Sequence, residues 1–351
     1  MRTRTVSFPA VGVDGAEQEQ TGLLHVPDSP APAGGFPVVV YGHMTTGGSP
    51  RSAPSIGGPG HPEWRRMSQG DALCEALVAR GIAVLRPDYE GIGSPGIHPY
   101  LIGSSLAASM TAMMRARASF DAGLGDVWVA AGHSEGAVAA LHASVAAEPD
   151  ARSRLVATAA FAPVTRMDVS IGAARRAPVR FPGSGVVSAL IALMLRGAAT
   201  VDERMRELLA AGGLSDRAAE LWGDLDRLCL TELAAPASWG GIAPGRIGGP
   251  AGRELFARLD ASFRANEVAA LGGFRAPVRI DAARFDEVAP ATLSARMLRS
   301  YRAAGVELTS RWWPTHHSGA MHPRHAPSEA ADWIAGSCAH GQRVAFGAGS
   351  G

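Results

Sequence analysis

Three short segments of the chain carry residue types that can act together in nucleophilic catalysis. The first is residues 132–136, Gly-His-Ser-Glu-Gly, which lies between an apolar, β-prone run and an alanine-rich run. A G-x-S-x-G pentapeptide between a strand and a helix holds its serine on a sharp turn, with the hydroxyl projecting from the sheet. The flanking glycines permit a backbone conformation that a Cβ would strain. The pattern therefore predicts Ser134 as the nucleophile of an acyl-transfer reaction.

A serine hydroxyl needs a base to take its proton and an acid to orient that base. Where a serine lies on such a turn, the acid and then the histidine follow it on loops after later strands. The second segment, residues 313–319, has the sequence Trp-Pro-Thr-His-His-Ser-Gly. We predict His317 as the base, because two small residues follow it, and keep His316 as the alternative. His322 and His325 are less favourably placed.

The third segment supplies the acid and has the sequence Phe-Asp-Glu-Val-Ala-Pro over residues 285–290. Asp286 is the preferred acid because it lies several residues beyond a strand and just before a helix. Glu287 is a weaker choice, and Asp281 lies against the strand itself. Asp168, after the strand that follows the serine, is a further rival. A structural role for Asp286 would be to cap the following helix.

Two backbone amides are expected to hold the oxyanion that forms when the serine attacks a carbonyl. One is the amide of Glu135, next to the nucleophile. The other comes from the loop of residues 42–47, where Thr45 is the first choice and Met44 the alternative. A carboxylate facing the oxyanion would oppose the developing charge, so we expect the Glu135 side chain to point toward an arginine or solvent.

Asp88 and Glu90 have the appearance of an acid/base pair. We expect a structural role instead, since short acidic side chains commonly bond backbone amides near turns.

These residues must be positioned by alternating strands and helices. Apolar, β-prone runs predict strands at residues 3–8, 21–26, 36–41, 82–85, 127–131, 155–161, 277–280 and 306–312. Predicted helices cover residues 68–80, 105–118, 137–148, 291–304 and 329–337, the last with Ser328 as its N-cap. Such alternation favours an α/β fold with a mostly parallel sheet covered on both faces by helices.

The strand signals disappear between residues 165 and 273, where the pattern is helical and broken by Gly- and Pro-rich loops. We therefore predict a core of residues 1–164 and 274–340, with an inserted helical cap of residues 165–273. Residues 341–351 are expected to form a flexible tail. The apolar run 186–195 is either a buried cap helix or a wall of the acyl pocket.

Composition excludes several other classes of protein. The 351 residues have a formal net charge of +1, which gives no electrostatic basis for binding nucleic acid or an anionic membrane. No apolar run reaches the roughly 20 residues that span a bilayer. No secretory signal is visible, so a cytoplasmic location is expected. The three cysteines are widely spaced and predict neither a disulfide framework nor a metal site, and no cofactor is implied.

Taken together, these motifs resemble the secretory-lipase-type α/β-hydrolases, particularly their bacterial members. The shared motifs are residues 41–47 (Tyr-Gly-His-Met-Thr-Thr-Gly), 87–91 (Pro-Asp-Tyr-Glu-Gly), 98–103 (His-Pro-Tyr-Leu-Ile-Gly), 132–136, 286–290 and 317–319. The resemblance covers roughly residues 36–333 and implies an α/β-hydrolase fold. It also implies Ser134 as nucleophile, Asp286 as acid and His317 as base.

The chain departs from this family at three positions near the nucleophile. Met44 stands where glycine is usual, and Glu135 and Ala137 stand where Gln and Gly are common. The family's usual secretion signal is also absent from the sequence.

We therefore expect a serine hydrolase that cleaves a small carboxylic ester through an acyl-enzyme. An acyltransferase, thioesterase or lactone-processing enzyme with the same three residues is the alternative. A non-catalytic binding protein on the same fold is a third hypothesis, motivated by Met44. The sequence leaves the acyl chain, the leaving group and the oligomeric state open.

Overall fold

The chain folds around one sheet of eight strands. The structure is a computed structural model that describes residues 1–347, with side chains through residue 344. The strands are β1 (Arg2–Val11), β2 (Glu17–Val26), β3 (Phe36–Gly42), β4 (Ala83–Pro87), β5 (Leu124–His133), β6 (Arg154–Phe161), β7 (Val278–Ala283) and β8 (Leu308–Trp313). They lie in the order β1-β2-β4-β3-β5-β6-β7-β8.

The sheet is parallel from β4 to β8, and only the N-terminal hairpin departs from this direction. β1 pairs antiparallel with β2, and β2 pairs antiparallel with β4. The remaining neighbours are all parallel. The predicted α/β class and mostly parallel sheet are therefore confirmed. The carboxyl ends of the parallel strands share one edge, where loops from distant parts of the sequence meet.

Burial on both faces explains why the central strands are continuously apolar. In β3, Val38 and Val40 pack into the larger core cluster, whereas Val39 and Tyr41 pack into the smaller one. Successive side chains of a strand point to opposite faces, so one short run of sequence contributes to both clusters.

The described part of the chain contains thirteen α-helices. They are α1 (Trp64–Met67), α2 (Asp71–Val78), α3 (Gly103–Arg115), α4 (Arg117–Phe120), α5 (Glu135–Val145), α6 (Met167–Ala174), α7 (Ser184–Ala199), α8 (Glu203–Ala210), α9 (Asp216–Glu220), α10 (Leu230–Leu233), α11 (Gly252–Ala265), α12 (Ala291–Ala303) and α13 (Ala326–Gly347). Short 3-10 turns are η1 (Pro50–Ser52), η2 (Pro54–Ile56), η3 (Trp222–Asp226), η4 (Trp239–Gly241), η5 (Pro244–Arg246), η6 (Val268–Ala270) and η7 (Ser318–Met321).

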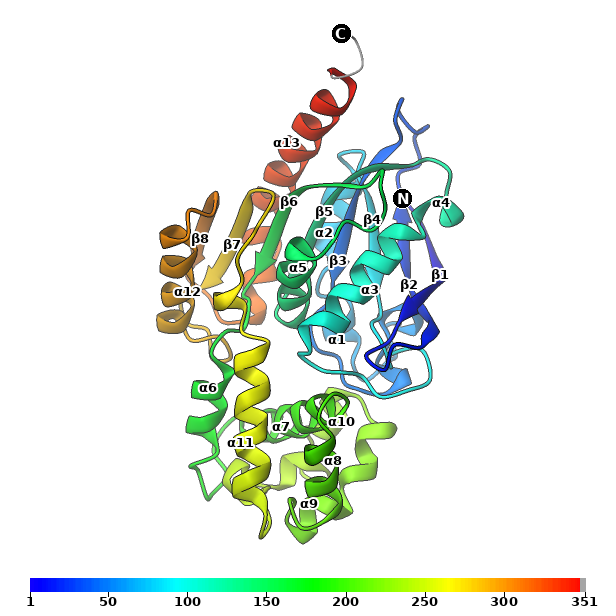
Figure 1. Cartoon of the computed structure of the whole chain (residues 1–351). Helices are drawn as coiled ribbons and strands as arrows, with labels where there is room; N and C mark the ends of the chain where they lie inside the picture. The colour runs from blue at the N-terminus through cyan, green and yellow to red at the C-terminus, as the bar shows by residue number, and fades with distance from the viewer. Residues whose placement is uncertain (348–351) are drawn as a thin grey trace.

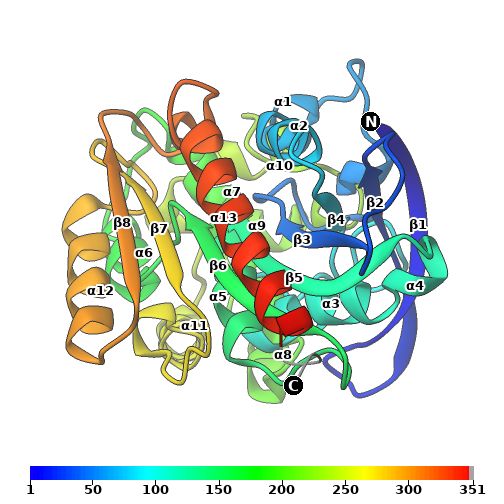
Figure 2. The same ribbon diagram turned by 90° about the horizontal axis from the view of Figure 1, so that it is seen from above.

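Helices cover both faces of the sheet, as Figure 2 shows. Buried side chains of α2 and α13 belong to the smaller core cluster, and those of α3, α5 and α12 belong to the larger one. The sheet is thus enclosed between two helical layers, and its carboxyl edge is left for loops.

Helices α6 to α11 follow one another without an intervening strand and form a separate layer beyond the carboxyl edge of the sheet (Figure 1). We call this stretch the helical segment. Helix α7 contains the apolar run 186–195, and residues 189 and 191–195 of this run are buried in the larger core cluster. Most of the apolar run is therefore buried.

The C-terminal helix differs from its prediction at both ends. It begins at Ala326, so Ser328 lies inside the first turn and is not the N-cap. Pro327 falls in that first turn, where its missing N–H and fixed φ suit a helix. The helix continues to Gly347, so the flexible tail predicted from residue 341 is wrong for residues 341–347. Residues 348–351 lie outside the described part of the chain.

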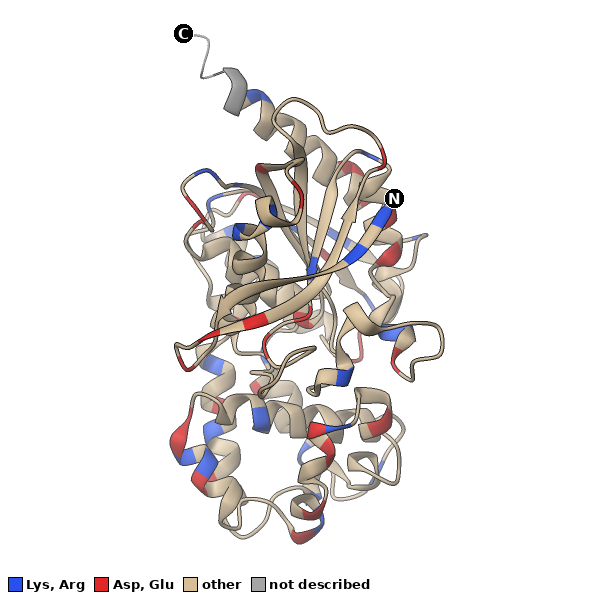
Figure 3. Ribbon diagram, turned by 90° about the vertical axis from the view of Figure 1, so that its right-hand side faces the viewer, with Lys and Arg blue, Asp and Glu red and all other residues tan. Residues whose placement is uncertain are grey.

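Charges of both signs are interspersed over the sheet and the helical segment (Figure 3), in keeping with the net charge of +1. None of the helices in the described residues combines the length and apolar character needed to cross a membrane.

Candidate active site

Ser134 occupies the turn between β5 and α5. Its backbone has φ 57° and ψ −113°, a conformation that is costly for a residue with a side chain. Its N–H donates to the carbonyl of Phe161 at 2.9 Å, which ties the turn to the neighbouring strand β6. The surrounding contacts thus hold the serine in a strained conformation that presents its hydroxyl at the carboxyl edge.

Glycine is required on both sides of this turn for steric reasons. A Cβ on Gly136 would lie 1.9 Å from the carbonyl oxygen of Gly42, and one on Gly132 would lie 2.1 Å from the carbonyl oxygen of Gly136. Both separations are far shorter than a van der Waals contact. The two glycines therefore allow β3, β5 and α5 to approach closely below the serine.

The structure brings Ser134, His317 and Asp286 into one hydrogen-bonded row. Nε2 of His317 is 2.8 Å from Oγ of Ser134, and Nδ1 is 2.9 Å from each carboxylate oxygen of Asp286. A carboxylate accepts hydrogen bonds, so Nδ1 carries the proton and Nε2 is free to accept the serine proton. The three side chains come from the loops after β7 and β8 and from the turn after β5.

The acid and the base are each held by further contacts. Asp286 accepts hydrogen bonds from the amides of Val288 at 2.9 Å and Ala289 at 2.6 Å. The amide of His317 donates to Oε2 of Glu287 at 3.0 Å. Glu287, the weaker candidate for the acid, therefore bonds the backbone of His317 and leaves its ring to Asp286.

A second histidine lies beside the row without joining it. The ring of His133 is 5.1 Å from the ring of His317, centroid to centroid. Burial, and next the charge of His317, keep the pKa of His133 well below its usual range. His133 therefore stays neutral beside His317.

The other sequence candidates have different partners. His316 is exposed, next to the buried His317. Asp281 lies within β7, where its carboxylate accepts from Arg279 and from the indole N–H of Trp313. Asp168 lies in α6 and pairs with Arg166. None of the three has a hydrogen bond to Ser134 or His317 among the described residues.

The loop expected to supply an oxyanion amide is fixed by its own contacts. Oγ1 of Thr45 is 2.9 Å from the hydroxyl of Tyr100, and Nδ1 of His43 donates to the carbonyl of Met44 at 2.7 Å. The amides of Thr45 and Glu135 have no hydrogen-bond partner within the described residues. One of these two unpaired donors directly follows the nucleophile at the start of α5, and the other lies on the loop after β3.

The Glu135 side chain does not point toward an arginine or solvent, and this expectation was wrong. Glu135 is only 1% exposed, and its Oε1 lies 2.7 Å from Nε2 of His98. His98 was not predicted as the partner of Glu135, although it lies in the motif at residues 98–103. The two residues are 37 positions apart, so no local pattern joined them.

Asp88 and Glu90 have structural contacts, as expected. Asp88 accepts from the amide of Ser55 at 3.0 Å and the hydroxyl of Thr21 at 2.7 Å. Glu90 accepts from the amide of Val13 at 3.1 Å, and its other oxygen accepts from Ser105. The two carboxylates fasten loops from distant parts of the sequence.

The helical segment packs directly on the loop that carries Thr45. The amide of Leu230 donates to the carbonyl of Thr46 at 2.9 Å, and Gly47 forms an isolated bridge with Cys229. Ser134 is only 6% exposed and His317 3%. The row of Ser134, His317 and Asp286 is therefore enclosed in this conformation.

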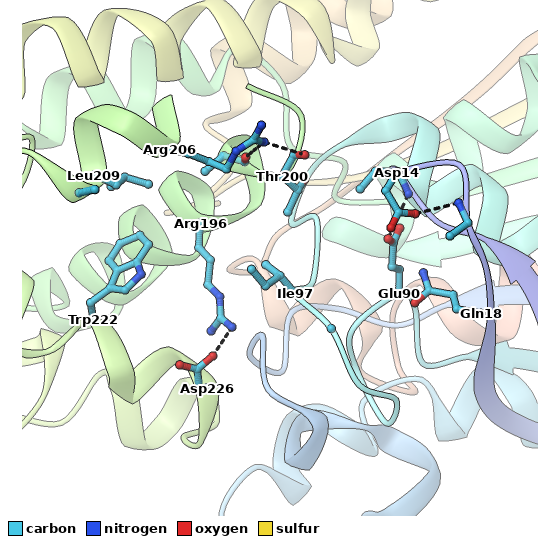
Figure 4. Close-up of a pocket in the computed structure, with 15 residues that line it drawn as sticks. Asp14, Gln18, Glu90, Ile97, Arg196, Thr200, Arg206, Leu209, Trp222 and Asp226 are labelled. Carbon is cyan, nitrogen blue, oxygen red and sulfur yellow. Dashed lines mark hydrogen bonds and ion pairs between the residues drawn. The ribbon is translucent and has the colours of Figure 1, made fainter. Parts of the chain in front are cut away.

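A large cavity lies elsewhere, between the N-terminal hairpin and helices α7 and α8 (Figure 4). It measures about 750 Å³ and is lined by polar and apolar side chains, among them Glu90, Ile97, Arg196 and Trp222. Ser134 is not among its lining residues. No group of three or more His, Cys, Asp or Glu side chains in the described residues is placed to hold a metal ion.

Comparison with known proteins locates the fold. No protein-family model matches the chain, and no curated protein matches its sequence. Solved structures do match. Lipase A of Candida antarctica superposes with a TM-score of 0.71 at 13% identity, covering 90% of this chain and 77% of that chain.

Two bacterial structures match over a larger share of both chains. A candidate hydrolase of Legionella pneumophila gives a TM-score of 0.74 at 17% identity, covering 95% of this chain and 88% of that one. The rice cell wall degrading esterase LipA of Xanthomonas oryzae gives a TM-score of 0.68 at 18% identity. The match covers 97% of this chain and 89% of that chain. The chain therefore has the α/β-hydrolase fold, in the form that these lipase and esterase structures display.

Proposed function

We propose that the protein is a serine hydrolase that cleaves carboxylic esters through an acyl-enzyme. The observation that carries the proposal is the row in which Nε2 of His317 lies 2.8 Å from Oγ of Ser134 while Nδ1 bonds Asp286. This is the arrangement in which an imidazole can take a proton from a hydroxyl and hold it beside a carboxylate. The lipase and esterase neighbours add support at the level of the fold.

In the first half of the reaction, Oγ of Ser134 attacks the ester carbonyl as its proton passes to Nε2 of His317. The carbonyl oxygen becomes an oxyanion, which the amides of Thr45 and Glu135 receive; the amide of Met44 is the alternative. Each such donor is typically worth about 3 kcal/mol of barrier. Asp286 stabilises the imidazolium that forms. Nε2 then returns the proton to the leaving alcohol as the ester C–O bond breaks.

In the second half, a water molecule gives a proton to Nε2 of His317 and attacks the acyl carbonyl. The bond between the acyl group and Oγ breaks, and the proton on Nε2 passes to Ser134. The products are the carboxylic acid and the free serine. We further propose that residues 165–273 form a cap, because the helical segment packs on the loop of Thr45 and the serine beneath is enclosed.

The direct test is turnover of p-nitrophenyl esters by the wild type and by Ser134→Ala. We expect the variant to lose activity by at least about 10⁴-fold, because the nucleophile is gone. Ser300→Ala, on the exposed side of α12, is the matched control and should retain wild-type turnover. A fluorophosphonate should label the wild type and not Ser134→Ala. Wild-type turnover in Ser134→Ala would refute the assignment.

Transfer of the acyl group to an acceptor other than water is a second candidate function. It is favoured by the enclosure of Ser134, since limited access of water prolongs the life of an acyl-enzyme. Product analysis with and without a competing alcohol, amine or thiol separates the two reactions. A series of esters of increasing acyl length then defines the substrate class, because short-chain preference indicates an esterase and long-chain preference a lipase.

A further inference from the structure

The buried contact between Glu135 and His98 is not used by the mechanism above. Glu135 follows the nucleophile directly, and its amide is a proposed oxyanion donor. Its carboxylate Oε1 lies 2.7 Å from Nε2 of His98, whose Nδ1 lies 2.8 Å from the carbonyl oxygen of Glu90. Both side chains are almost fully buried. The inference drawn from this contact rests on the proposed function and concerns the same site.

The partners of the His98 ring determine how many protons the pair holds. A carbonyl oxygen only accepts, so Nδ1 of His98 must carry a proton to bond Glu90. The 2.7 Å contact on the other side also needs a proton between nitrogen and oxygen, since two lone pairs at that distance would repel. That proton belongs either to an imidazolium facing a carboxylate or to a carboxylic acid facing a neutral imidazole. In both cases the pair has no net charge.

Among the described residues, His98 is the only side chain that hydrogen-bonds the Glu135 carboxylate. Its second oxygen, Oε2, is buried and has no hydrogen-bond partner there. Burial lowers the pKa of His43 and raises the pKa values of Tyr89 and Tyr100, so these three neighbours are neutral. The nearby carboxylates are occupied elsewhere: burial raises the pKa of Asp88, which bonds Ser55 and Thr21, and Glu90 bonds Val13 and Ser105.

Charge at this position matters because negative charge develops close to it during the reaction. An uncompensated carboxylate on the residue whose amide receives the oxyanion would repel that oxyanion. Repulsion between buried charges is much stronger than in water. Replacing His98 by a residue that cannot carry a positive charge would create this situation in the folded protein.

We propose that His98 is a positioning residue that keeps the Glu135 carboxylate electrically compensated, so that the turn after β5 can receive an oxyanion. His98 touches neither the nucleophile nor the base through a hydrogen bond in the described residues. It acts through Glu135. The expected signature is a loss of kcat on replacement of His98 that removal of the Glu135 carboxylate reverses.

The kinetic test compares single and double variants. His98→Gln keeps a side-chain amide near Glu135 but cannot carry a positive charge, and we expect kcat to fall about 10- to 100-fold with little change in KM. In His98→Gln/Glu135→Gln the carboxylate is gone, so kcat should recover about 10-fold or more from that of the single variant. Glu254→Gln, at an exposed ion pair with Arg204, is the matched carboxylate-to-amide control.

A merely structural role for His98 predicts a different result. The double variant would then be as slow as His98→Gln or slower. That result overturns the proposal. Thermal unfolding of each variant shows whether the fold survives.

An independent measurement separates this inference from the proposed function. In protein labelled with ¹⁵N-histidine, NMR at neutral pH should show protons on both ring nitrogens of His98, or a shared proton between Nε2 and Glu135 that disappears in Glu135→Gln. An unprotonated Nε2 with no shared proton overturns the inference, whatever the activity. If ester turnover and fluorophosphonate labelling both fail, the proposed function falls while the NMR result still decides the state of the pair.

Discussion

Two buried histidine–carboxylate pairs flank Ser134, and they differ in the partner of the second ring nitrogen. In one, His317 faces Asp286 through Nδ1 and a serine hydroxyl through Nε2. In the other, His98 faces Glu135 through Nε2 and a backbone carbonyl through Nδ1. A hydroxyl can give up a proton, whereas a carbonyl can only accept one. The comparison teaches that a carboxylate beside an imidazole does not by itself make a base.

The two pairs also differ in how they are attached to the fold. His317 and Asp286 lie on loops at the carboxyl ends of β8 and β7, where backbone amides and Glu287 fix them. Glu135 begins α5, and His98 lies on the loop after β4. We therefore expect the first pair to control proton transfer and the second to control only the charge near the oxyanion.

Among substitutions that test the difference between the two pairs, we expect the largest loss of turnover at His317. His317→Gln removes the proposed base, and turnover of p-nitrophenyl esters should fall by about 10⁴-fold or more. His316→Gln, at the exposed neighbour, should stay within about twofold of the wild type, as surface substitutions usually do. If His98→Gln were as damaging as His317→Gln, the distinction between the two pairs would be lost.

Asp286→Asn is expected to rank next. An amide can donate to Nδ1, which favours the wrong tautomer of His317, so kcat should fall by about 10³- to 10⁴-fold. Asp168→Asn is the matched control, because Asp168 pairs with Arg166 in α6. Steady-state measurement of kcat for Asp286→Asn and Asp168→Asn tests this prediction. Activity near the wild-type level in Asp286→Asn would point to a different acid.

Of the substitutions at His317, Asp286 and Glu287, we expect the one at Glu287 to lower turnover the least. Its Oε2 accepts the amide of His317, so Glu287→Ala frees that loop and should lower kcat about 10-fold through looser positioning of the base. Glu287→Gln keeps an oxygen that can accept and should lose less. Equal losses in the two variants would show that the charge of Glu287, and not its hydrogen bond, is what matters.

Much of the fold was predictable because the central strands carry a local signal. Runs such as Val38-Val39-Val40 are short, apolar and bounded by Gly and Pro, which is typical of a buried parallel strand. The start of α13 was not predictable in the same way. Ser328 has the side chain of an N-cap, but the helix starts two residues earlier and takes Pro327 into its first turn.

At the site, the chain order of serine, acid and histidine led to three residues that the structure brings within hydrogen-bond distance. The three residues follow successive strands along the chain, so their order can be recognised from the sequence alone. The orientation of Glu135 was mispredicted for the opposite reason. The partner that neutralises it, His98, reaches it only through the packing of the loop after β4 against α5, and chain order carries no information about that contact.

The spacing of the candidate site along the chain has a consequence for the making of the protein. His317 follows Ser134 by 183 residues. A ribosome that adds about 5–20 residues per second needs roughly 10–40 s to cover that distance. Throughout this interval a nascent chain contains the serine turn but lacks its proposed base. Products of premature termination before residue 317 would lack this base, and we expect them to be inert toward esters.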